Sequence, residues 1–287
     1  MASLKDLRRR IRATKSMQQI FKAMEMVAAA KLRRAQQRAQ AASPYAAKIS
    51  AMLANLSGAA AELEHPLFKV REVRTTALVL ITADRGFAGA YNTAILRVAE
   101  QRLKVAPPGS IQCVVVGRKG RDYLRRRGYP VLAAHTDLPG EASLELARRI
   151  TNDLTERFIA GEVDRVEILY THFVNAIVRR VLTATFLPIG TGIGSGDATS
   201  AAGSAIFEPD AESIFAELLP RYATAMLYAS MADALASEHS ARMVAMGSAR
   251  KNAGELVDAL TLTRNRMRQA AITREISELV AGAEALN

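Results

Sequence analysis

Glycine is confined almost entirely to the middle of this chain, and that distribution constrains the fold more than any other feature. Residues 1–57 contain no glycine, and residues 206–287 contain only Gly247, Gly254 and Gly282. The other fourteen of the 17 glycines lie between 58 and 205. Because glycine is unfavourable inside helices and common in turns, the ends favour long helices and the middle favours a domain with many turns.

Apolar residues at both ends recur at helical spacing. At the N-terminal end these residues predict one apolar stripe along a helix: Leu4, Leu7, Ile11, Met17, Ile20, Met24 and Val27. At the C-terminal end a mostly apolar series repeats at heptad spacing: Leu256, Leu260, Thr263, Met267 and Ala270. A further series on a shifted face predicts that the final turns extend past their partner helix: Ile272, Ile276, Leu279, Ala283 and Leu286. Two helical ends of one chain most simply pair with each other.

The middle of the chain alternates between short β-branched runs and helix-like stretches. The predicted strands are 77–81, 112–116, 129–133, 163–173 and 179–187, and the predicted helices are 92–104, 118–127 and 143–160. This alternation predicts an α/β domain with a mostly parallel sheet and helices on its faces. The low-complexity segment 190–205 predicts a flexible linker. The predicted domains are therefore 1–57, 58–205 and 206–287.

Positive charge is concentrated on the first predicted helix. The net charge is +11, and residues 1–57 hold 12 Lys and Arg against Asp6 and Glu25 alone. The basic side chains of such a helix either face solvent, dock on an acidic protein surface, or bind nucleic acid. The few aromatic residues and the absence of a nucleic-acid motif argue against the third interpretation.

No residue constellation points to catalysis, a cofactor or a metal. The stretch 81–92 follows a strand and precedes a helix, but it lacks a nucleotide-loop fingerprint, so we expect a structural turn in which Asp84 and Arg85 form a local ion pair. The four histidines lack metal-ligand spacing. Cys113, the single cysteine, lies in an apolar run and is expected to be buried. No segment is apolar enough to span a membrane, so we expect a soluble protein that is not exported.

Several segments resemble the gamma subunit of F-type ATP synthases. They are 23–31 (AMEMVAAAK), 43–45 (SPY), 81–86 (ITADRG), 238–246 (EHSARMVAM) and 268–275 (RQAAITRE). The resemblance runs from the first residues to the last, and it is most specific at the two ends. It implies an antiparallel coiled coil of the N- and C-terminal helices with a Rossmann-like α/β middle domain.

The resemblance also implies a function and its partners. The chain would be the central rotor shaft that couples proton translocation to ATP synthesis or hydrolysis on the beta subunits, without being catalytic itself or binding a cofactor. Expected partners are the alpha and beta subunits, the epsilon subunit and the c-subunit ring, with no nucleic acid and no direct membrane insertion. The complex would place the chain peripherally, at the cytoplasmic face of the plasma membrane.

Matching positions give the expected subunit-interface residues. Met24 and Arg242 match residues that face an acidic loop of beta, while a second group matches contacts higher in the bearing: Arg268, Gln269 and Thr273. Phe207 and Glu208 match the foot near the ring. Pro220 departs from the family pattern and leaves open whether it ends a short first helix or lies in the first turn of the long one. No cysteine-bearing insert is present, so thiol regulation is not expected.

Two other classes of function stay open at the level of sequence. A nucleic-acid-binding coiled coil would use the basic residues of the first helix. An enzyme would use the loop from Gly86 to Asn92 to bind a nucleotide. The first would bind duplex with a steep dependence on salt, and the second would bind nucleotide as an isolated chain.

Overall fold

A computed structural model describes the backbone of residues 3–60, 65–189 and 211–284, and the side chains of 3–38, 40, 65–189 and 217–282. The chain divides into two compact units. The first unit comprises Met1–Ala28 and Arg242–Asn287, and the second comprises Ala29–Ala241. The predicted boundary at 57/58 lies within the described backbone, in a helix that continues to Ala60, and the boundary at 205/206 lies outside it; both stay predictions.

The two long helices predicted from the ends are present. Helix α1 spans Leu4–Ala60 and α5 spans Ala211–Glu284, so each contributes to both units. Pro220 lies inside α5, which corrects both sequence-based alternatives for this residue. The helix begins at Ala211, well before the proline, so the lost backbone donor is accommodated within a continuous helix. Thr224 donates its hydroxyl to the Pro220 carbonyl, 2.8 Å away, one turn further on.

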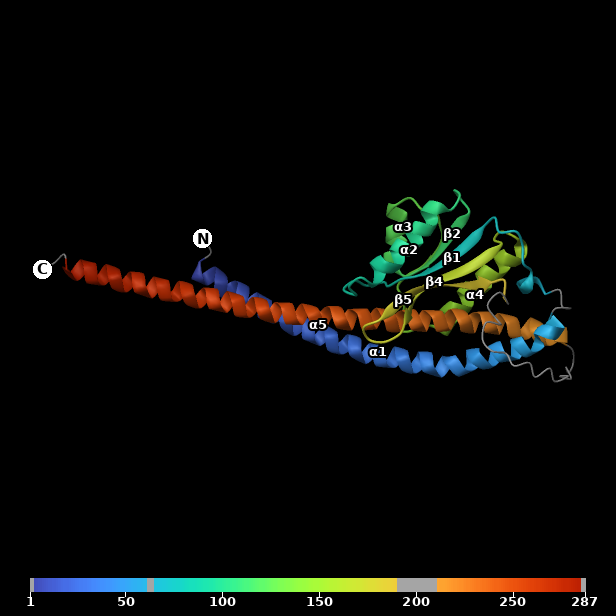
Figure 1. The fold of residues 1–287 in the computed structure, drawn as a ribbon, viewed down its shortest axis with the longest axis horizontal. Coiled ribbons are helices and arrows are strands. Elements are labelled where there is room, and N and C mark those ends of the chain that lie inside the picture. Colours follow the sequence, from blue (N-terminus) through green and yellow to red (C-terminus); the bar gives the residue numbers. More distant parts are fainter. Residues whose placement is uncertain (1–2, 61–64, 190–210, 285–287) are drawn as a thin grey trace. The chain divides into compact units, whose positions relative to one another are not determined.

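A five-stranded sheet forms the centre of the second unit (Figure 1). Its strands are β1 (Thr76–Ile81), β2 (Ile111–Val116), β3 (Val131–His135), β4 (Arg165–Phe173) and β5 (Arg179–Leu187). The intervening helices are α2 (Tyr91–Val105), α3 (Arg118–Arg126) and α4 (Leu144–Ala160), and a short 3-10 turn, η1, spans Pro66–Phe68. Every strand and helix predicted from the middle of the sequence is therefore present, with ends that differ by at most about two residues.

The strand order is β3-β2-β1-β4-β5. The first three neighbouring pairs are parallel, with Val79 opposite Val114 of β2 and Ile168 of β4. The β4 and β5 strands are antiparallel and joined without a helix. A mostly parallel sheet was predicted, and it is confirmed.

The two faces of the sheet carry separate cores. One face packs against α4 and against the part of α5 from Leu219 to Ala234, with Phe158 and Leu227 fully buried. The other face packs against α2 and α3, through residues such as Ile95 and Leu124. Cys113 is fully buried in this second core, and burial raises the pKa of its thiol to about 12. The expectation that this cysteine is a small core residue is confirmed.

Candidate subunit interface

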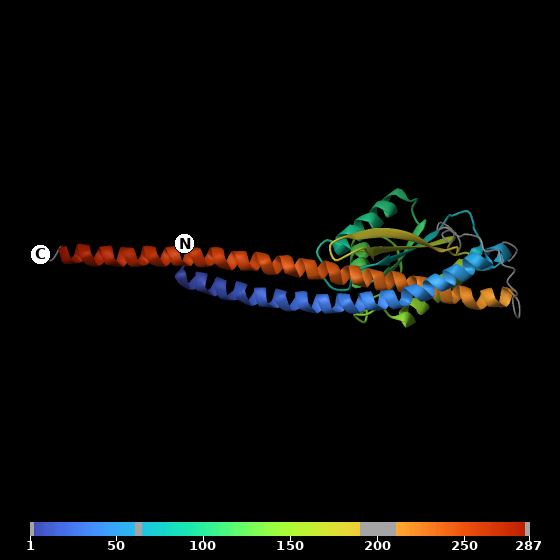
Figure 2. The same cartoon turned by 60° about the horizontal axis from the view of Figure 1, so that its bottom comes forward.

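The first unit is an antiparallel pair of helices held by a narrow seam (Figure 2). On α1 the seam is formed by buried Leu7, Ile11, Thr14 and Ala28, together with partly buried Gln18, Phe21 and Glu25. On α5 it is formed by buried Met246, Ala253 and Val257. Gly247 lies against Glu25, and Gly254 lies against Gln18, so small residues let the two backbones approach.

The buried row of α1 differs from the predicted stripe after Ile11. Met17, Ile20 and Val27 are 46%, 55% and 56% exposed, although the sequence pattern placed them in the stripe. The step from Ile11 to Met17 is six residues, one short of a heptad, so these residues lie on a neighbouring row of the helix. The seam instead keeps its heptad spacing through Thr14, Gln18 and Phe21.

The predicted stripe of α5 needs the same correction. Leu256 is 50% exposed, and Thr263 and Ala270 are also exposed, while Ala253 and Val257 occupy the seam. Leu260 and Met267 are partly buried, as the prediction requires. Leu260 and Met267 keep the heptad spacing of Ala253 and Val257, so on both helices some residues of the predicted stripe lie outside the seam.

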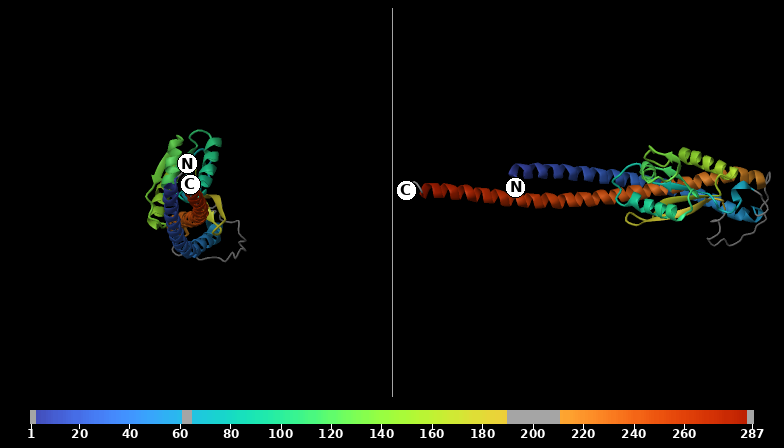
Figure 3. Two further views of the ribbon diagram at one scale, coloured as in Figure 1. Left: turned by 90° about the vertical axis from the view of Figure 1, so that its left-hand side faces the viewer. Right: turned by 90° about the horizontal axis from the view of Figure 1, so that it is seen from above.

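The C-terminal turns of α5 extend past the first residue of α1 (Figure 3). Ile272, Ile276, Leu279 and Val280 in these turns are between 47% and 75% exposed. This confirms, for the residues that the structure describes, that the last turns have no partner helix within the unit. Ala283 and Leu286 of the predicted series lie outside the described side chains.

A further set of exposed apolar residues lies beside the seam. It consists of Met17, Ile20, Met26 and Val27 of α1 and Val244, Leu256 and Leu262 of α5. We call these residues, together with Ile272, Ile276, Leu279 and Val280, the outer apolar row. An isolated soluble protein exposes single apolar residues freely, but exposed apolar residues repeated along both helices indicate a surface that contacts another protein.

Basic residues accompany the outer apolar row. The segment 261–274 contains four arginines and no acid, and Arg266, Arg268 and Arg274 are exposed. An ion pair joins the two helices of this unit, between Arg250 Nε and Glu25 Oε2 at 2.9 Å. The unit therefore presents apolar and positive surface together, which is complementary to an acidic partner. Because exposed ion pairs are individually weak, no single pair would hold that partner in one position.

The start of α1 is fixed by a reciprocal cap. Ser3 Oγ accepts a hydrogen bond from the Asp6 backbone, and Asp6 Oδ2 accepts hydrogen bonds from the Ser3 hydroxyl and backbone. These bonds from Ser3 lower the pKa of the Asp6 carboxyl. A capping box of this kind satisfies donors that a helix start otherwise leaves open.

Five of the expected interface residues lie in the first unit. Met24 and Arg242 are partly exposed, and Met24 is adjacent to Glu25, the residue that contacts Gly247 and Arg250. Arg268, Gln269 and Thr273 are exposed, and Thr273 Oγ1 donates to the Gln269 carbonyl at 3.0 Å. Phe207 and Glu208 lie outside the described residues. Their contacts with other subunits stay predictions.

The loop that invited a nucleotide-binding interpretation is built as a structural turn. Asp84 Oδ1 accepts from the Arg118 backbone at 2.7 Å, and Oδ2 accepts from the Leu138 backbone at 2.6 Å. The carboxylate thus lies at the start of α3, where an anion is stabilised by the helix dipole, and joins three segments of the domain. The predicted Asp84–Arg85 ion pair is wrong. Among the described side chains Arg85 makes no ion pair, and both carboxylate oxygens of Asp84 accept hydrogen bonds from backbone N–H groups.

The remaining donors at the start of α3 are also used internally. The Lys119 backbone donates to the Ala83 carbonyl, and the Gly120 backbone donates to Thr82 Oγ1 at 2.9 Å. Gly117 has a φ of +104°, and a Cβ there would lie 2.2 Å from the Thr82 carbonyl oxygen. The loop that contains Asp84 leads into α2, and the first residue of α2 contacts α5: the Tyr91 hydroxyl donates to the Ala234 carbonyl at 3.2 Å.

Polar contacts between α5 and the β4–β5 hairpin were not predicted from the sequence. Asp233 accepts from the Phe173 backbone at 2.9 Å, and its other oxygen lies 2.6 Å from His172 Nδ1. Ser237 donates to the Thr171 carbonyl and Ser240 to the Ala176 carbonyl. The spacing of 233, 237 and 240 on one helix face was the available signal, but it does not reveal which strand the face meets.

The described residues contain no group of three His, Cys, Asp or Glu side chains that a metal ion requires. Among the described helices, none has the length and hydropathy of a membrane span.

The chain matches one family of known proteins over almost its entire length. The family model described as ATP synthase matches residues 3–286. The ATP synthase gamma chain of Desulforamulus reducens is 46% identical over 286 residues, and that of Moorella thermoacetica is 45% identical over 287 residues. Each alignment covers 100% of this chain and 100% of its relative. The chain belongs to the ATP synthase gamma chain family.

Solved structures share the fold at low sequence identity. A chain in the Euglena gracilis mitochondrial ATP synthase, from a structure titled OSCP/F1/c-ring in rotational state 3, has a TM-score of 0.71 and 19% identity, covering 99% of this chain and 94% of that chain. A chain in the Tetrahymena thermophila mitochondrial ATP synthase central stalk and c-ring has a TM-score of 0.61 and 22% identity, covering 80% of this chain and 99% of that chain. Both solved structures therefore share this fold, which combines paired terminal helices and an α/β domain.

Proposed function

We propose that this chain is the central rotor shaft of an F-type ATP synthase, which couples proton translocation to ATP synthesis or hydrolysis by rotation. The observation that carries the proposal is the outer apolar row on the paired helices of the first unit, accompanied by positive charge. Such a surface contacts surrounding subunits over a long distance without forming many fixed bonds.

The mechanism follows from the asymmetry of this surface. The two helices present different residues around the pair, so each surrounding beta subunit meets a different face at any moment. A face that contacts one conformation of beta better than another shifts its equilibrium by the difference in contact free energy. Rotation then changes which beta subunit is favoured. Catalysis takes place on beta, and this chain transmits torque.

The proposed partners are those of the assemblies that contain the similar solved structures, F1 with the c-ring and the central stalk with the c-ring. The alpha and beta subunits surround the first unit, and the epsilon subunit and c-ring contact the second unit and the foot residues Phe207 and Glu208. The complex would hold the chain peripherally at the cytoplasmic face of the plasma membrane. If the assignment is right, the chain co-purifies with two larger nucleotide-binding proteins, each in threefold excess over it.

Rotation is tested with one introduced cysteine. Cys113 is buried and has a raised pKa, so the thiol of a Leu279→Cys variant is the one that reagents reach. Leu279 is 75% exposed at the proposed bearing. We expect a cross-link from this position to a surrounding subunit to stop ATP hydrolysis, and reductive cleavage of the linker to restore it.

The position of the cross-link gives the decisive outcome. One of the three beta subunits is labelled by the first cross-link, the linker is reduced, ATP is added and the cross-link is formed again. We expect the second cross-link to be distributed over all three beta subunits. Return to the same beta subunit after turnover contradicts the shaft function.

Met24 tests the expected contact with the acidic loop of beta. A Met24→Lys substitution adds an ammonium group, and an extra ion pair with that loop would hinder rotation and lower the number of protons pumped per ATP hydrolysed. Reconstituted vesicles measure this ratio, and Met24→Leu is the control of similar size without charge. An unchanged ratio in Met24→Lys contradicts the placement of Met24 against acidic surface.

A further inference from the structure

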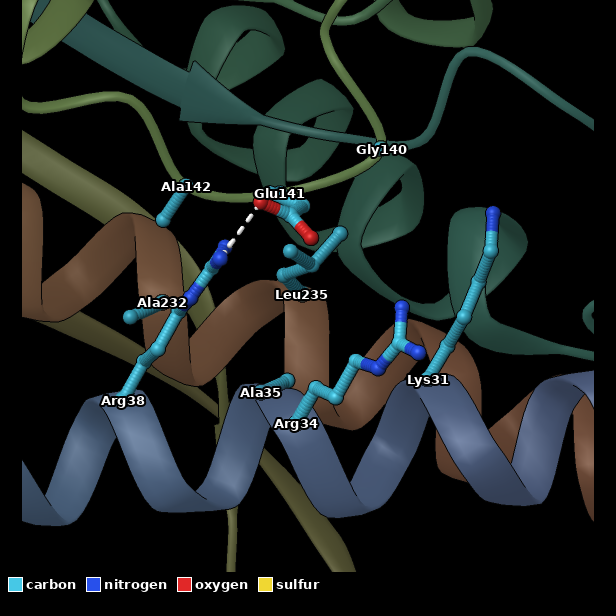
Figure 4. Close-up of a pocket in the computed structure, with 9 residues that line it drawn as sticks. All are labelled: Lys31, Arg34, Ala35, Arg38, Gly140, Glu141, Ala142, Ala232 and Leu235. Carbon is cyan, nitrogen blue, oxygen red and sulfur yellow. Dashed lines mark ion pairs between the residues drawn. The ribbon is translucent and has the colours of Figure 1, made fainter.

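A small cavity in the second unit gathers three basic side chains (Figure 4). Its volume is about 220 Å³. It lies between α1, α5 and the loop after β3, and it is lined by Lys31, Arg34, Ala35, Arg38, Gly140, Glu141, Ala142, Ala232 and Leu235. All of these residues belong to one compact unit.

The charge of the cavity is unbalanced. Glu141 is the one carboxylate in the lining, and it is paired with Arg38 at 2.5 Å. In the described part of the chain, Lys31 and Arg34 form no ion pair. Asp233 is adjacent to the lining residue Ala232, but its carboxylate is already occupied by His172 and the Phe173 backbone. The cavity therefore holds an excess of two positive charges.

A counter-charge relieves the repulsion among these basic side chains, of which Arg34 is exposed to solvent. Lys31 and Arg34 are three residues apart on α1, and Arg34 and Arg38 are four apart, spacings at which like charges repel. Buried Ala35 and Ala232 form an apolar floor, which strengthens electrostatic interactions near it. Gly140 brings the loop close to the ammonium group, because a Cβ there would lie 3.2 Å from Lys31 Nζ.

The size of the cavity defines the class of ligand. Pockets for drug-sized molecules are about 300–1,000 Å³, so this cavity is too small to enclose a whole nucleotide. It has room for several waters, each of which occupies about 30 Å³ in the liquid, and therefore for a compact oxyanion. Arginine guanidinium groups match the oxygens of phosphate in a bidentate geometry.

We propose that the cavity bounded by Lys31, Arg34, Arg38 and the Gly140–Ala142 loop binds a small polyvalent oxyanion of the phosphate class. The anion lies between Lys31 and Arg34 and neutralises the charge that Glu141 leaves uncompensated. It also connects α1 to the loop of the α/β domain, next to the Arg38–Glu141 ion pair. The site is independent of the shaft function, since it lies outside the outer apolar row.

The test uses the purified full-length chain with inorganic phosphate and pyrophosphate as probes. Isothermal titration at constant ionic strength measures the dissociation constant. We expect Arg34→Gln to weaken binding by about fivefold or more, since it removes one charge in contact with the anion. Arg33→Gln is the matched control, because Arg33 is exposed, as Arg34 is, but does not line the cavity. We expect it to leave binding unchanged.

A second variant changes binding in the opposite direction. Glu141→Gln removes the competing carboxylate and releases Arg38, so we expect tighter binding by about fivefold. A variant that merely disturbed folding would not gain affinity. Equal weakening in Arg33→Gln and Arg34→Gln, or no gain in Glu141→Gln, overturns the proposal in favour of diffuse attraction to a basic protein.

The source of the phosphate group is distinguished by adding ADP as a third probe. Binding of pyrophosphate without ADP supports a free anion as the ligand. Binding of ADP with the same response to the Arg34 and Glu141 variants supports the terminal phosphates of a nucleotide, with the base outside the cavity. Absence of binding by all three probes overturns the proposal.

Discussion

The two compact units of this chain use apolar residues in opposite ways. In the second unit the sheet has a core on each face, and residues such as Leu154 and Ile168 are completely buried. In the first unit the helices share a narrow seam, and Leu279, of the same chemistry as Leu154, is 75% exposed. The second unit is stabilised by its own packing, while the first retains apolar surface that only another protein can bury.

The largest expected effect compares one substitution in both units. Leu154→Ala removes a fully buried side chain from the α4 core and leaves a cavity, so we expect a loss of about 2–5 kcal/mol in the free energy of unfolding. Leu279→Ala is the matched variant, and we expect a change within about 0.5 kcal/mol. Urea denaturation followed by circular dichroism measures both. Similar losses in the two variants contradict the contrast between the units.

The next effect concerns the turn at the start of α3. Gly117→Ala introduces a Cβ in a left-handed conformation and 2.2 Å from the Thr82 carbonyl oxygen, so the backbone must shift. We expect a loss of about 2–4 kcal/mol in stability, from strain and overpacking together. Gly109→Ala is the control, since its φ is +81° but nothing lies within 4 Å of the added Cβ. Its loss should be no more than about 1–2 kcal/mol.

A smaller, pH-dependent effect is expected at Asp164. Its Oδ2 accepts from the Thr75 backbone at 2.9 Å and from the Arg74 backbone at 3.0 Å, and these bonds lower the pKa of the carboxyl. A lowered pKa means that the stabilisation is present above the unfolded pKa, near 3.9, and is lost as the pH falls through the folded value. We expect Asp164→Asn to cost about 1 kcal/mol at pH 7.

Acidification should then reduce the difference between Asp164→Asn and the original chain. Thermal unfolding at pH 7, 4 and 3 measures this difference. A difference that stays constant over this range would exclude the carboxylate as its source.

The smallest expected effect tests the seam of the first unit. Gly254→Ala places a Cβ 2.9 Å from Gln18 Nε2, which is the end of a flexible side chain that can move. Alanine gains about 1 kcal/mol of helix propensity over glycine, so the net change should be within about 0.5 kcal/mol. Gly282→Ala, with nothing within 4 Å, isolates the propensity gain. A loss above about 2 kcal/mol in Gly254→Ala would mean that the seam is as tightly packed as the α/β core.

Much of the fold could be predicted because it depends on local patterns. The strand β1 and the helix α4 were predicted to within one residue at each end, since β-branched runs and helical periodicity are local properties. The parallel order of the sheet followed from the alternation of strands and helices. The partners of Asp84 could not be predicted, because Arg118 and Leu138 are distant in sequence and meet it only in the folded domain.

The candidate interface shows the same limit. The sequence indicated that the last turns of α5 exceed their partner, and exposed Ile272 and Ile276 agree with this. It placed Met17 and Ile20 in the buried stripe, and the structure exposes them. Two adjacent rows of α1 have the same helical spacing, so periodicity alone does not distinguish the buried row from the exposed one.

Long helices at both ends and an α/β domain in the middle are encoded locally, because glycine content, periodicity and β-branched runs act within a few residues. The tertiary structure decided which apolar row of each helix is buried. That choice depends on where Ala28, Ala253 and Gly247 allow two backbones to approach, which is a property of the pair. The row that this pairing leaves exposed is the surface that we assign to the neighbouring subunits.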